Sequence, residues 1–284
     1  MNMSFKKLKS WAKVNLSLNV IRQLPSNYHK IESLITFVQF SDVIKIKSID
    51  AAKHKISFFG KFSKGIGTKN TVIKLLNLLE KKKLIKNKKF EIKVTKNIPQ
   101  KSGMGGGSMN AACILKYLIK KKIVNISAKK ANEIAHEVGA DVVLGLEKKN
   151  SILLKNGKTV RLNNKLNFYV LIAMPKFGCS TKNIFSRVVK FSKPMYFKGN
   201  KAFFKINNLV QSKNDLENIV FKKYSKIKSL KHFLSSLPNA AFARMTGSGS
   251  AVVAYFKSKK TANNAAKIFK SNYKSYWYIV SKTI

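Results

Sequence analysis

Residues 98–112 read IPQKSGMGGGSMNAA and contain four glycines within five positions. A run with strand-like alternation, 90–95, precedes this segment, and helix-like spacing begins at Ser108. Glycine lets the backbone approach a ligand closely, and the first turn of a helix offers unpaired N–H groups and a partial positive charge. This order of elements predicts a phosphate-binding loop rather than a flexible surface loop, and a nucleoside triphosphate is the first ligand to consider.

Two widespread phosphate loops do not fit this segment. A Walker A loop ends in Gly-Lys-Ser or Gly-Lys-Thr, and neither follows Gly107. A Rossmann fingerprint requires a glycine where Ser108 stands. The run Gly-Met-Gly-Gly-Gly-Ser-Met-Asn-Ala-Ala instead resembles the central motif of the GHMP kinases, which are small-molecule kinases.

Four other segments follow the order found in one family of GHMP kinases. They are SWAKVNLSLNVIRQLPSNYHKIESL at 10–34, GADVVLGL at 139–146, NDLE at 214–217 and MTGSGSAVV at 245–253. Together they resemble the 4-diphosphocytidyl-2-C-methyl-D-erythritol kinase family. The pair Tyr28-His29 is the most specific feature, because it is not general to GHMP kinases.

The chain departs from the family pattern at several loop positions. Trp11 and Val143 replace prolines, Ser26-Asn27 replaces the Asp-Gly of a turn, and Met104 and Met109 replace leucine and serine. None of these changes removes a catalytic group. They bear on loop rigidity and affinity more than on the identity of the reaction.

The pattern of elements predicts an α+β fold, because strands and helices mix without strict βαβ alternation. Strands are expected at 11–21, 34–46, 55–59, 90–95, 151–154, 168–173 and 276–280, with a strand–turn–strand unit at 241–256. Helices are expected at 68–82 with Thr68 as its cap, 108–121, 127–139 with Ser127 as its cap, 181–189, 215–221, 226–234 and 260–270.

The resemblance implies a two-domain GHMP kinase fold with the active site in the cleft. Residues 1–160 would form the N-terminal, ATP-binding domain, which is ribosomal-protein-S5-like. Residues 161–284 would form the C-terminal domain, a ferredoxin-like α/β sandwich.

Composition is compatible with a reduced, cytoplasmic protein. The chain has 284 residues, of which 45% are hydrophobic, enough for a substantial core. No apolar run is long enough for a bilayer, and no secretory signal with a cleavage site is visible. The two cysteines, Cys113 and Cys179, form neither a metal-ligand pattern nor a disulfide framework, and Cys113 is expected in the core.

The formal net charge of +46 raises the alternative of nucleic-acid binding. The lysines are spread along the whole chain, and only four arginines occur. Arginine is the residue that reads bases and phosphates bidentately, so AT-rich codon usage explains the composition better than specific RNA binding does. We expect a small-molecule substrate, no specific nucleic acid, no membrane, and a monomer or weak homodimer.

Aspartate is scarce, so the candidates for a catalytic carboxylate are few. Asp42 and Asp50 flank a strand and are interpreted as turn residues, and Asp215 stands at a helix start, where capping is the simpler role. Asp141 lies at the edge of an apolar segment, where its residues alone allow capping equally well. The family resemblance assigns the role of catalytic base to Asp141.

Lys13 is the second catalytic candidate. Alternation places it with Asn15 on the face opposite Val14, and a solvent-facing lysine is an equal alternative from the pattern. The resemblance implies that Lys13 pairs with Asp141 and stabilises the transferring charge. It also implies that Asn15 holds the acceptor hydroxyl.

The remaining site residues bind ATP and the acceptor. Tyr28, His29 and Phe185 form the expected cytidine site, and Thr181 is expected at the methylerythritol end. Magnesium is expected with ATP, with Ser108 as a candidate ligand. The glycine turn 246–250 either closes over phosphates or is a plain hairpin. The expected ATP-binding residues are Pro99, Gln100, Lys101, Ser102, Gly103, Met104, Gly105, Gly106, Gly107, Ser108 and Met109.

The resemblance implies ATP-dependent phosphorylation of the 2-hydroxyl of 4-diphosphocytidyl-2-C-methyl-D-erythritol, in the non-mevalonate route to isoprenoid precursors. Another GHMP kinase acting on homoserine or mevalonate is the nearest alternative. A non-catalytic, basic nucleic-acid-binding protein and a decayed enzyme are the others.

Overall fold

The computed structural model describes residues 4–26, 28–196 and 199–284. The chain divides into two compact units. The first comprises Met1–Ala12, Phe40–Pro99 and Gly105–Lys148, and the second comprises Lys13–Gln39, Gln100–Met104 and Lys149–Ile284. The expected domain limits, 1–160 and 161–284, stay a prediction.

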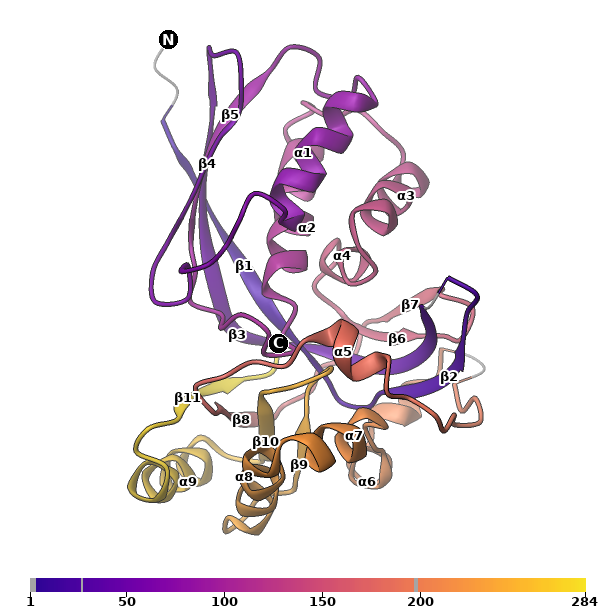
Figure 1. Cartoon of the computed structure of the whole chain (residues 1–284), viewed down its shortest axis with the longest axis vertical. Helices are drawn as coiled ribbons and strands as arrows, with labels where there is room; N and C mark the ends of the chain where they lie inside the picture. Colours follow the sequence, from indigo (N-terminus) through magenta and orange to yellow (C-terminus); the bar gives the residue numbers. More distant parts are fainter. Residues whose placement is uncertain (1–3, 27, 197–198) are drawn as a thin grey trace. The chain divides into compact units, whose positions relative to one another are not determined.

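The first unit is a sheet with helices on one face. Strand β4 (Lys55–Phe59) pairs in parallel with β5 (Lys89–Thr95), and β5 pairs antiparallel with residues 43–49 of β3 (His29–Ile49). Strand β1 (Lys6–Asn15) also pairs with β3. The covering helices are α1 (Thr71–Lys81), α2 (Gly106–Lys120), α3 (Ala128–Val138) and α4 (Val142–Gly145), which lie on one side of these strands in Figure 1.

The helix starts of this unit follow from side-chain and glycine chemistry. Asn70, not the expected Thr68, caps α1, since its side chain accepts hydrogen bonds from the amides of Val72 and Ile73 at 3.1 Å each. Ser127 caps α3 as expected. Helix α2 begins two residues before Ser108, at Gly106.

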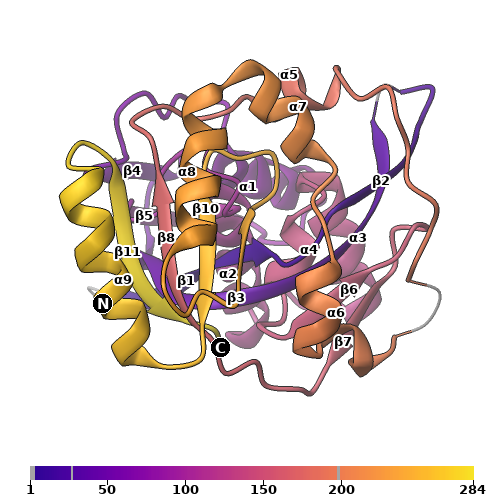
Figure 2. The same cartoon turned by 90° about the horizontal axis from the view of Figure 1, so that it is seen from below.

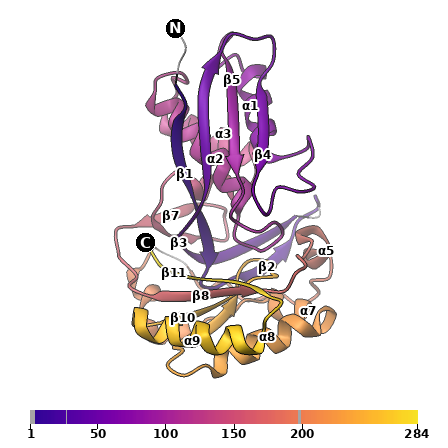
Figure 3. The same cartoon turned by 90° about the vertical axis from the view of Figure 1, so that its left-hand side faces the viewer.

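The second unit contains a four-stranded sheet in the order β11-β8-β10-β9, and its pairs are antiparallel. Helices α7 and α8 fall between β8 and β9, and α9 falls between β10 and β11, which gives the βαββαβ order of a ferredoxin-like fold. Figures 2 and 3 show α8 and α9 on one face of this sheet. The bounds are β8 (Tyr169–Met174), α7 (Leu216–Lys223), α8 (Ser225–Ser236), β9 (Phe242–Met245), β10 (Val252–Phe256), α9 (Lys259–Asn272) and β11 (Trp277–Lys282). The expected α+β fold and ferredoxin-like C-terminal part are confirmed.

The other elements that the structure describes in the second unit are three strands that extend the sheet from the start of β3, and three short helices. Strand β2 and strand β6 pair with β3, and β7 pairs with β6. The sequence missed β7, α6 and the 3-10 helix η1, and α5 ends four residues before the expected limit of 189. The bounds are β2 (Asn19–Gln23), β6 (Asn150–Leu153), β7 (Thr159–Leu162), α5 (Thr181–Phe185), η1 (Lys201–Phe204) and α6 (Ile206–Gln211).

The expected single strand 11–21 is wrong, because β1 ends at Asn15 and β2 begins at Asn19. The break is held by hydrogen bonds. The carbonyl of Leu34 accepts from the amides of both Leu16 and Ser17, and the Ser17 hydroxyl accepts from the Leu34 amide at 3.0 Å. Among the described residues, no helix is long and apolar enough to cross a membrane.

Candidate active site

The N-terminus of α2 carries the second half of the glycine segment. Gly105 takes the N-cap position with φ of 68°, and no side chain caps the helix. Gly106, Gly107 and Ser108 form the first turn of this 15-residue helix. The amides of that turn are therefore not occupied by a capping side chain, and the helix dipole favours an anion there. Phosphate binding at this helix N-terminus stays a prediction.

Two glycines of the segment are closely packed against neighbouring residues. A Cβ atom on Gly106 would lie 3.0 Å from the Lys96 ammonium and 3.1 Å from a methyl group of Ile98. A Cβ atom on Gly103, in the second unit, would lie 1.9 Å from the carbonyl oxygen of Thr246, and its φ is 79°. Gly103 therefore excludes any larger residue, whereas a side chain at Gly106 would require Lys96 or Ile98 to shift slightly.

The first half of the segment, 100–104, is held within the second unit by backbone hydrogen bonds. The carbonyl of Lys101 accepts from the amides of Cys179 at 3.0 Å and Ser250 at 3.2 Å. The carbonyl of Ser102 accepts from the amide of Ala251 at 3.2 Å. The glycine turn between β9 and β10 therefore fixes the path of 100–104.

That turn, 246–250, joins the antiparallel strands β9 and β10 as a buried hairpin with specific polar contacts, and its closing over phosphates stays a prediction. Thr246, Ser248 and Ser250 are buried. The Thr246 hydroxyl accepts from the backbone amide of Asn15 at 3.0 Å and donates to the Gly103 carbonyl at 3.2 Å. The turn thereby connects Asn15 to the first half of the glycine segment.

Lys13 and Asn15 are brought together at the end of β1. The Lys13 ammonium donates to the Asn15 side-chain oxygen at 2.7 Å, and the Asn15 amide group donates to the Ser33 hydroxyl at 2.7 Å. Lys13 is 3% exposed and its backbone amide bonds to the Met104 carbonyl at 3.2 Å. The solvent-facing alternative for Lys13 is therefore wrong, because this strand is covered on both faces at this point.

Asp141 lies in the first unit, between α3 and α4. Gly139 ends α3, and Asp141 occupies the N-cap position of α4 without making a side-chain cap hydrogen bond. The residue is half-buried. Capping of α4, the structural alternative for this carboxylate, is therefore not its role.

Aromatic rings surround His29 at the start of β3. Its imidazole centroid lies 5.3 Å from the Phe185 ring and 6.4 Å from the Phe191 ring, while Tyr28 is 74% exposed. Burial lowers the pKa of His29, which favours the neutral imidazole. Its Nε2 is buried without a hydrogen-bond partner in the described part of the chain. The sequence missed Phe191, which is one of many phenylalanines, and Asn27 lies outside the described residues.

Thr181 contacts the second glycine turn. Its hydroxyl lies 2.9 Å from the Ser248 hydroxyl, and either oxygen can donate. Thr181 is the first residue of α5, whose N-cap is Ser180. The structure therefore places Thr181 beside the turn that also contacts Asn15.

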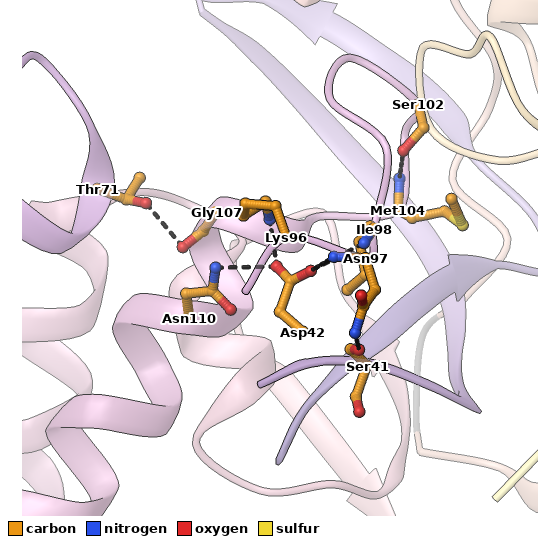
Figure 4. A network of polar contacts seen from close by, with 10 residues as sticks. All are labelled: Ser41, Asp42, Thr71, Lys96, Asn97, Ile98, Ser102, Met104, Gly107 and Asn110. Carbon is orange, nitrogen blue, oxygen red and sulfur yellow. Dashed lines mark hydrogen bonds and ion pairs between the residues drawn. The ribbon is translucent and has the colours of Figure 1, made fainter. Parts of the chain in front are cut away.

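The sequence also misread Asp42, which is a fully buried residue within β3 and not a turn residue. Its carboxylate accepts hydrogen bonds from four groups near the glycine segment, which Figure 4 shows. A signal was present, because alternation places Asp42 on the same face as the buried Ile44 and Ile46.

The NDLE motif supports the second glycine turn. The Asn214 side chain donates to the carbonyls of Met245 and Gly247 at 2.8 Å each, and its oxygen accepts from the Leu216 amide at 3.0 Å. The buried Glu217 carboxylate accepts from the Met245 amide at 2.8 Å, and burial raises the pKa of Glu217.

Asp215 does not cap α7, so the expected capping role is wrong. Its carboxylate instead accepts from the Val20 amide and the Ser192 hydroxyl, each at 2.8 Å. The cap bond to α7 comes from the preceding residue, Asn214.

The cysteines have no arrangement suited to chemistry. Cys113 is only partly buried, which corrects the expected core position, and Cys179 is buried. Burial raises the pKa of each thiol to about 11, so both stay protonated near neutral pH. Within the described ranges, no group of three or more His, Cys, Asp and Glu residues could hold a metal ion.

Comparisons with known proteins match this arrangement. The model of the GHMP kinases N-terminal domain matches residues 70–148, and that of the GHMP kinases C-terminal domain matches 200–275. The chain is 48% identical to the 4-diphosphocytidyl-2-C-methyl-D-erythritol kinase of Pelagibacter ubique (strain HTCC1062), covering 98% of this chain and 99% of that protein. It is 31% identical to the kinase of the same name from Clostridium perfringens (strain SM101 / Type A), covering 98% of each.

The chain belongs to the 4-diphosphocytidyl-2-C-methyl-D-erythritol kinase family of GHMP kinases. A crystal structure of 4-(cytidine 5'-diphospho)-2C-methyl-D-erythritol kinase has the same fold, with a TM-score of 0.79, 20% identity, and coverage of 98% of this chain and 99% of that one. Membership of this kinase family makes the chain an ATP-dependent small-molecule kinase.

Proposed function

We propose that the chain transfers the γ-phosphoryl group of ATP to the 2-hydroxyl of 4-diphosphocytidyl-2-C-methyl-D-erythritol, in the non-mevalonate route to isoprenoid precursors. The observation that carries this proposal is the 48% identity to a kinase of that name over 98% of the chain. The uncapped helix N-terminus and the aromatic group around His29 support it.

ATP binds with its phosphates at the N-terminus of α2. The uncapped amides of the first turn and the helix dipole neutralise phosphate charge, while the glycines permit close approach. Pro99 to Met109 form this binding segment. Magnesium fits as a companion of ATP rather than as a resident metal, because the described residues hold no acidic cluster for it. Ser108, in the first turn, is the candidate protein ligand.

Asp141 and Lys13 carry out the chemistry. Asp141 accepts the proton of the acceptor hydroxyl or orients that hydroxyl, and Lys13 stabilises the charge that develops during transfer. The 2.7 Å bond from Lys13 to Asn15 supports a shared role, with Asn15 orienting the acceptor. Burial of Lys13 strengthens its electrostatic effect, since screening by water is reduced.

The cytidine moiety is recognised by Tyr28, His29 and Phe185. An exposed Tyr28 ring offers a face for base stacking, and the neutral His29 offers a nitrogen that the described residues leave without a partner. Thr181 contacts the methylerythritol end. The protein acts in the cytoplasm as a monomer or weak homodimer, without a specific nucleic-acid partner.

A panel of acceptors tests the function. Purified protein is incubated with magnesium, γ-labelled ATP and, in separate reactions, 4-diphosphocytidyl-2-C-methyl-D-erythritol, homoserine or mevalonate. We expect label transfer to the cytidine compound alone. Transfer to homoserine or mevalonate would keep the kinase and overturn the acceptor, and no transfer by folded protein would overturn the proposed function.

A further inference from the structure

We propose that Asp42 is a positioning residue that fixes both flanks of the phosphate-binding segment, with Asn110 as its link to α2. The argument rests on the proposed function, because it takes this segment as the ATP site. Asp42 and the four residues that donate to it, Lys96, Asn97, Ile98 and Asn110, are called the Asp42 cluster.

One carboxylate oxygen of Asp42 organises the chain before the glycine segment. Its Oδ1 accepts from the backbone amides of Asn97 and Ile98, each at 2.8 Å. The Asn97 side chain adds a bond of 2.9 Å to the carbonyl of Ser41. Backbone amides that share one acceptor are held in a fixed conformation, so the entry to the segment is set by Asp42.

The other oxygen reaches the chain after the glycines. Its Oδ2 accepts from the Asn110 side chain at 3.0 Å and also pairs with the Lys96 ammonium. Asn110 lies on α2, four residues after Gly106. Figure 4 shows Asp42 between the residues before the glycines and the helix that follows them.

The Asp42 cluster also touches the glycine segment itself. The Lys96 ammonium lies 3.0 Å from where a Cβ of Gly106 would stand, so it packs against the first turn of α2. Asp42 is 0% exposed and Asn110 is 1% exposed, so water does not compete for these bonds. A buried and charge-assisted network of this kind resists displacement, which is what a preorganised anion site requires.

Asn110 allows a test that leaves the buried ion pair intact. Asn150 is a matched control, because it is 2% exposed and its amide donates to the Asn164 carbonyl at 2.8 Å. Each of the two asparagines has an Oδ1 without a partner within the described part of the chain. Asn110→Ala and Asn150→Ala therefore each remove a buried asparagine side chain that donates a hydrogen bond, but only Asn110 belongs to the Asp42 cluster.

The experiment measures the affinity of each variant for ATP and for adenosine, by competition with a fluorescent ATP analogue. We expect ATP affinity to fall about tenfold in Asn110→Ala, with adenosine affinity within about twofold of wild type. Asn150→Ala should keep both affinities within about twofold. Hydrogen exchange at 97–110 should be faster in Asn110→Ala but unchanged in α3.

Equal ATP affinity of Asn110→Ala and wild type, or equal loss of ATP and adenosine, would overturn the proposal. Asn110→Leu serves as a second variant. If neither Asn110 variant folds, the side chain is a global structural requirement and the positioning role is wrong. Absence of ATP binding by wild type would instead overturn the proposed function, so the two failures are distinguishable.

Discussion

Two glycine segments of this chain are each held by one buried polar side chain, but the chemistry differs. The segment at α2 depends on Asp42, a carboxylate that accepts four hydrogen bonds, one of them from the Lys96 ammonium. The turn 246–250 depends on Asn214, a neutral amide that donates two hydrogen bonds and accepts one.

The difference lies in what remains when the side chain is removed. Loss of Asp42 would leave a buried ammonium without its carboxylate, which is costly because a charge in the interior is poorly solvated. Loss of Asn214 would leave two carbonyls without donors, a smaller cost. The side chain that supports the first segment is therefore part of an ion pair, whereas Asn214 supports the second segment as a neutral amide.

Substitutions at the two proposed catalytic residues, which support neither glycine segment, should have the largest effect on turnover. We expect Asp141→Asn or Lys13→Ala to lower kcat by about 100- to 10,000-fold, since proton transfer and charge stabilisation are lost. ATP affinity, measured by calorimetry, should stay within about threefold of wild type for each variant. Near-normal kcat in either purified variant would remove that residue from the mechanism.

Substitution of Asp42, which pairs with Lys96, should have the largest effect on the free energy of unfolding. We expect Asp42→Asn to lower the free energy of unfolding by about 3–5 kcal/mol, measured by urea titration, because Lys96 stays buried without its partner. Adding Lys96→Met should restore much of that loss. Asp50→Asn is the control, since Asp50 is exposed and a change within about 0.5 kcal/mol is expected. If Asp42→Asn and Asp50→Asn lowered the free energy of unfolding equally, the ion pair of Asp42 with Lys96 would not stabilise the first segment.

The neutral support should show an intermediate effect. We expect Asn214→Ala to cost about 1–3 kcal/mol of unfolding free energy, because the carbonyls of Met245 and Gly247 lose their donor. Asn272→Ala is the matched control. The Asn272 side chain donates to the carbonyl of Ile268 at 2.9 Å, but Asn272 is exposed. A loss in Asn214→Ala as large as in Asp42→Asn would show that charge is not what distinguishes the two supports.

An exposed residue that supports neither segment should change binding without changing stability. We expect Tyr28→Ala to weaken binding of the cytidine acceptor by about 1–3 kcal/mol through lost base stacking. The midpoint of thermal unfolding and the KM for ATP should not change, since Tyr28 is 74% exposed. An unchanged acceptor KM would exclude Tyr28 from the cytidine site.

The sequence predicted much of the fold because hydrophobic period and glycine position are local signals. It located β4 and the caps of α3, and the order of elements in the ferredoxin-like part. It misjudged the break after Asn15, because hydrogen bonds to Leu34 replace strand pairing there. Such a break depends on residues that are distant in sequence, which periodicity does not reveal.

Local sequence patterns could not predict the roles of Asp42 and Asn214 for the same reason. Asp42 is 68 positions from Asn110, and Asn214 is 33 positions from Gly247. A polar residue in an apolar alternation is a hint of a buried network, but its partners come only from the tertiary structure. Lys13 illustrates this limit. Alternation predicted that its side chain lies on the face opposite Val14, but it did not show that this face is buried as well.

The most direct test of the account is the proton-coupled phosphorus NMR spectrum of the product. Carbon 2 of 2-C-methyl-D-erythritol carries a methyl group and no hydrogen, so a phosphate on its hydroxyl has no proton three bonds away. We predict one new monoester resonance that is a singlet, beside the two diphosphate resonances of the substrate. A doublet or triplet would place the phosphate on another carbon, and no new resonance would mean no transfer, so either result would contradict the account.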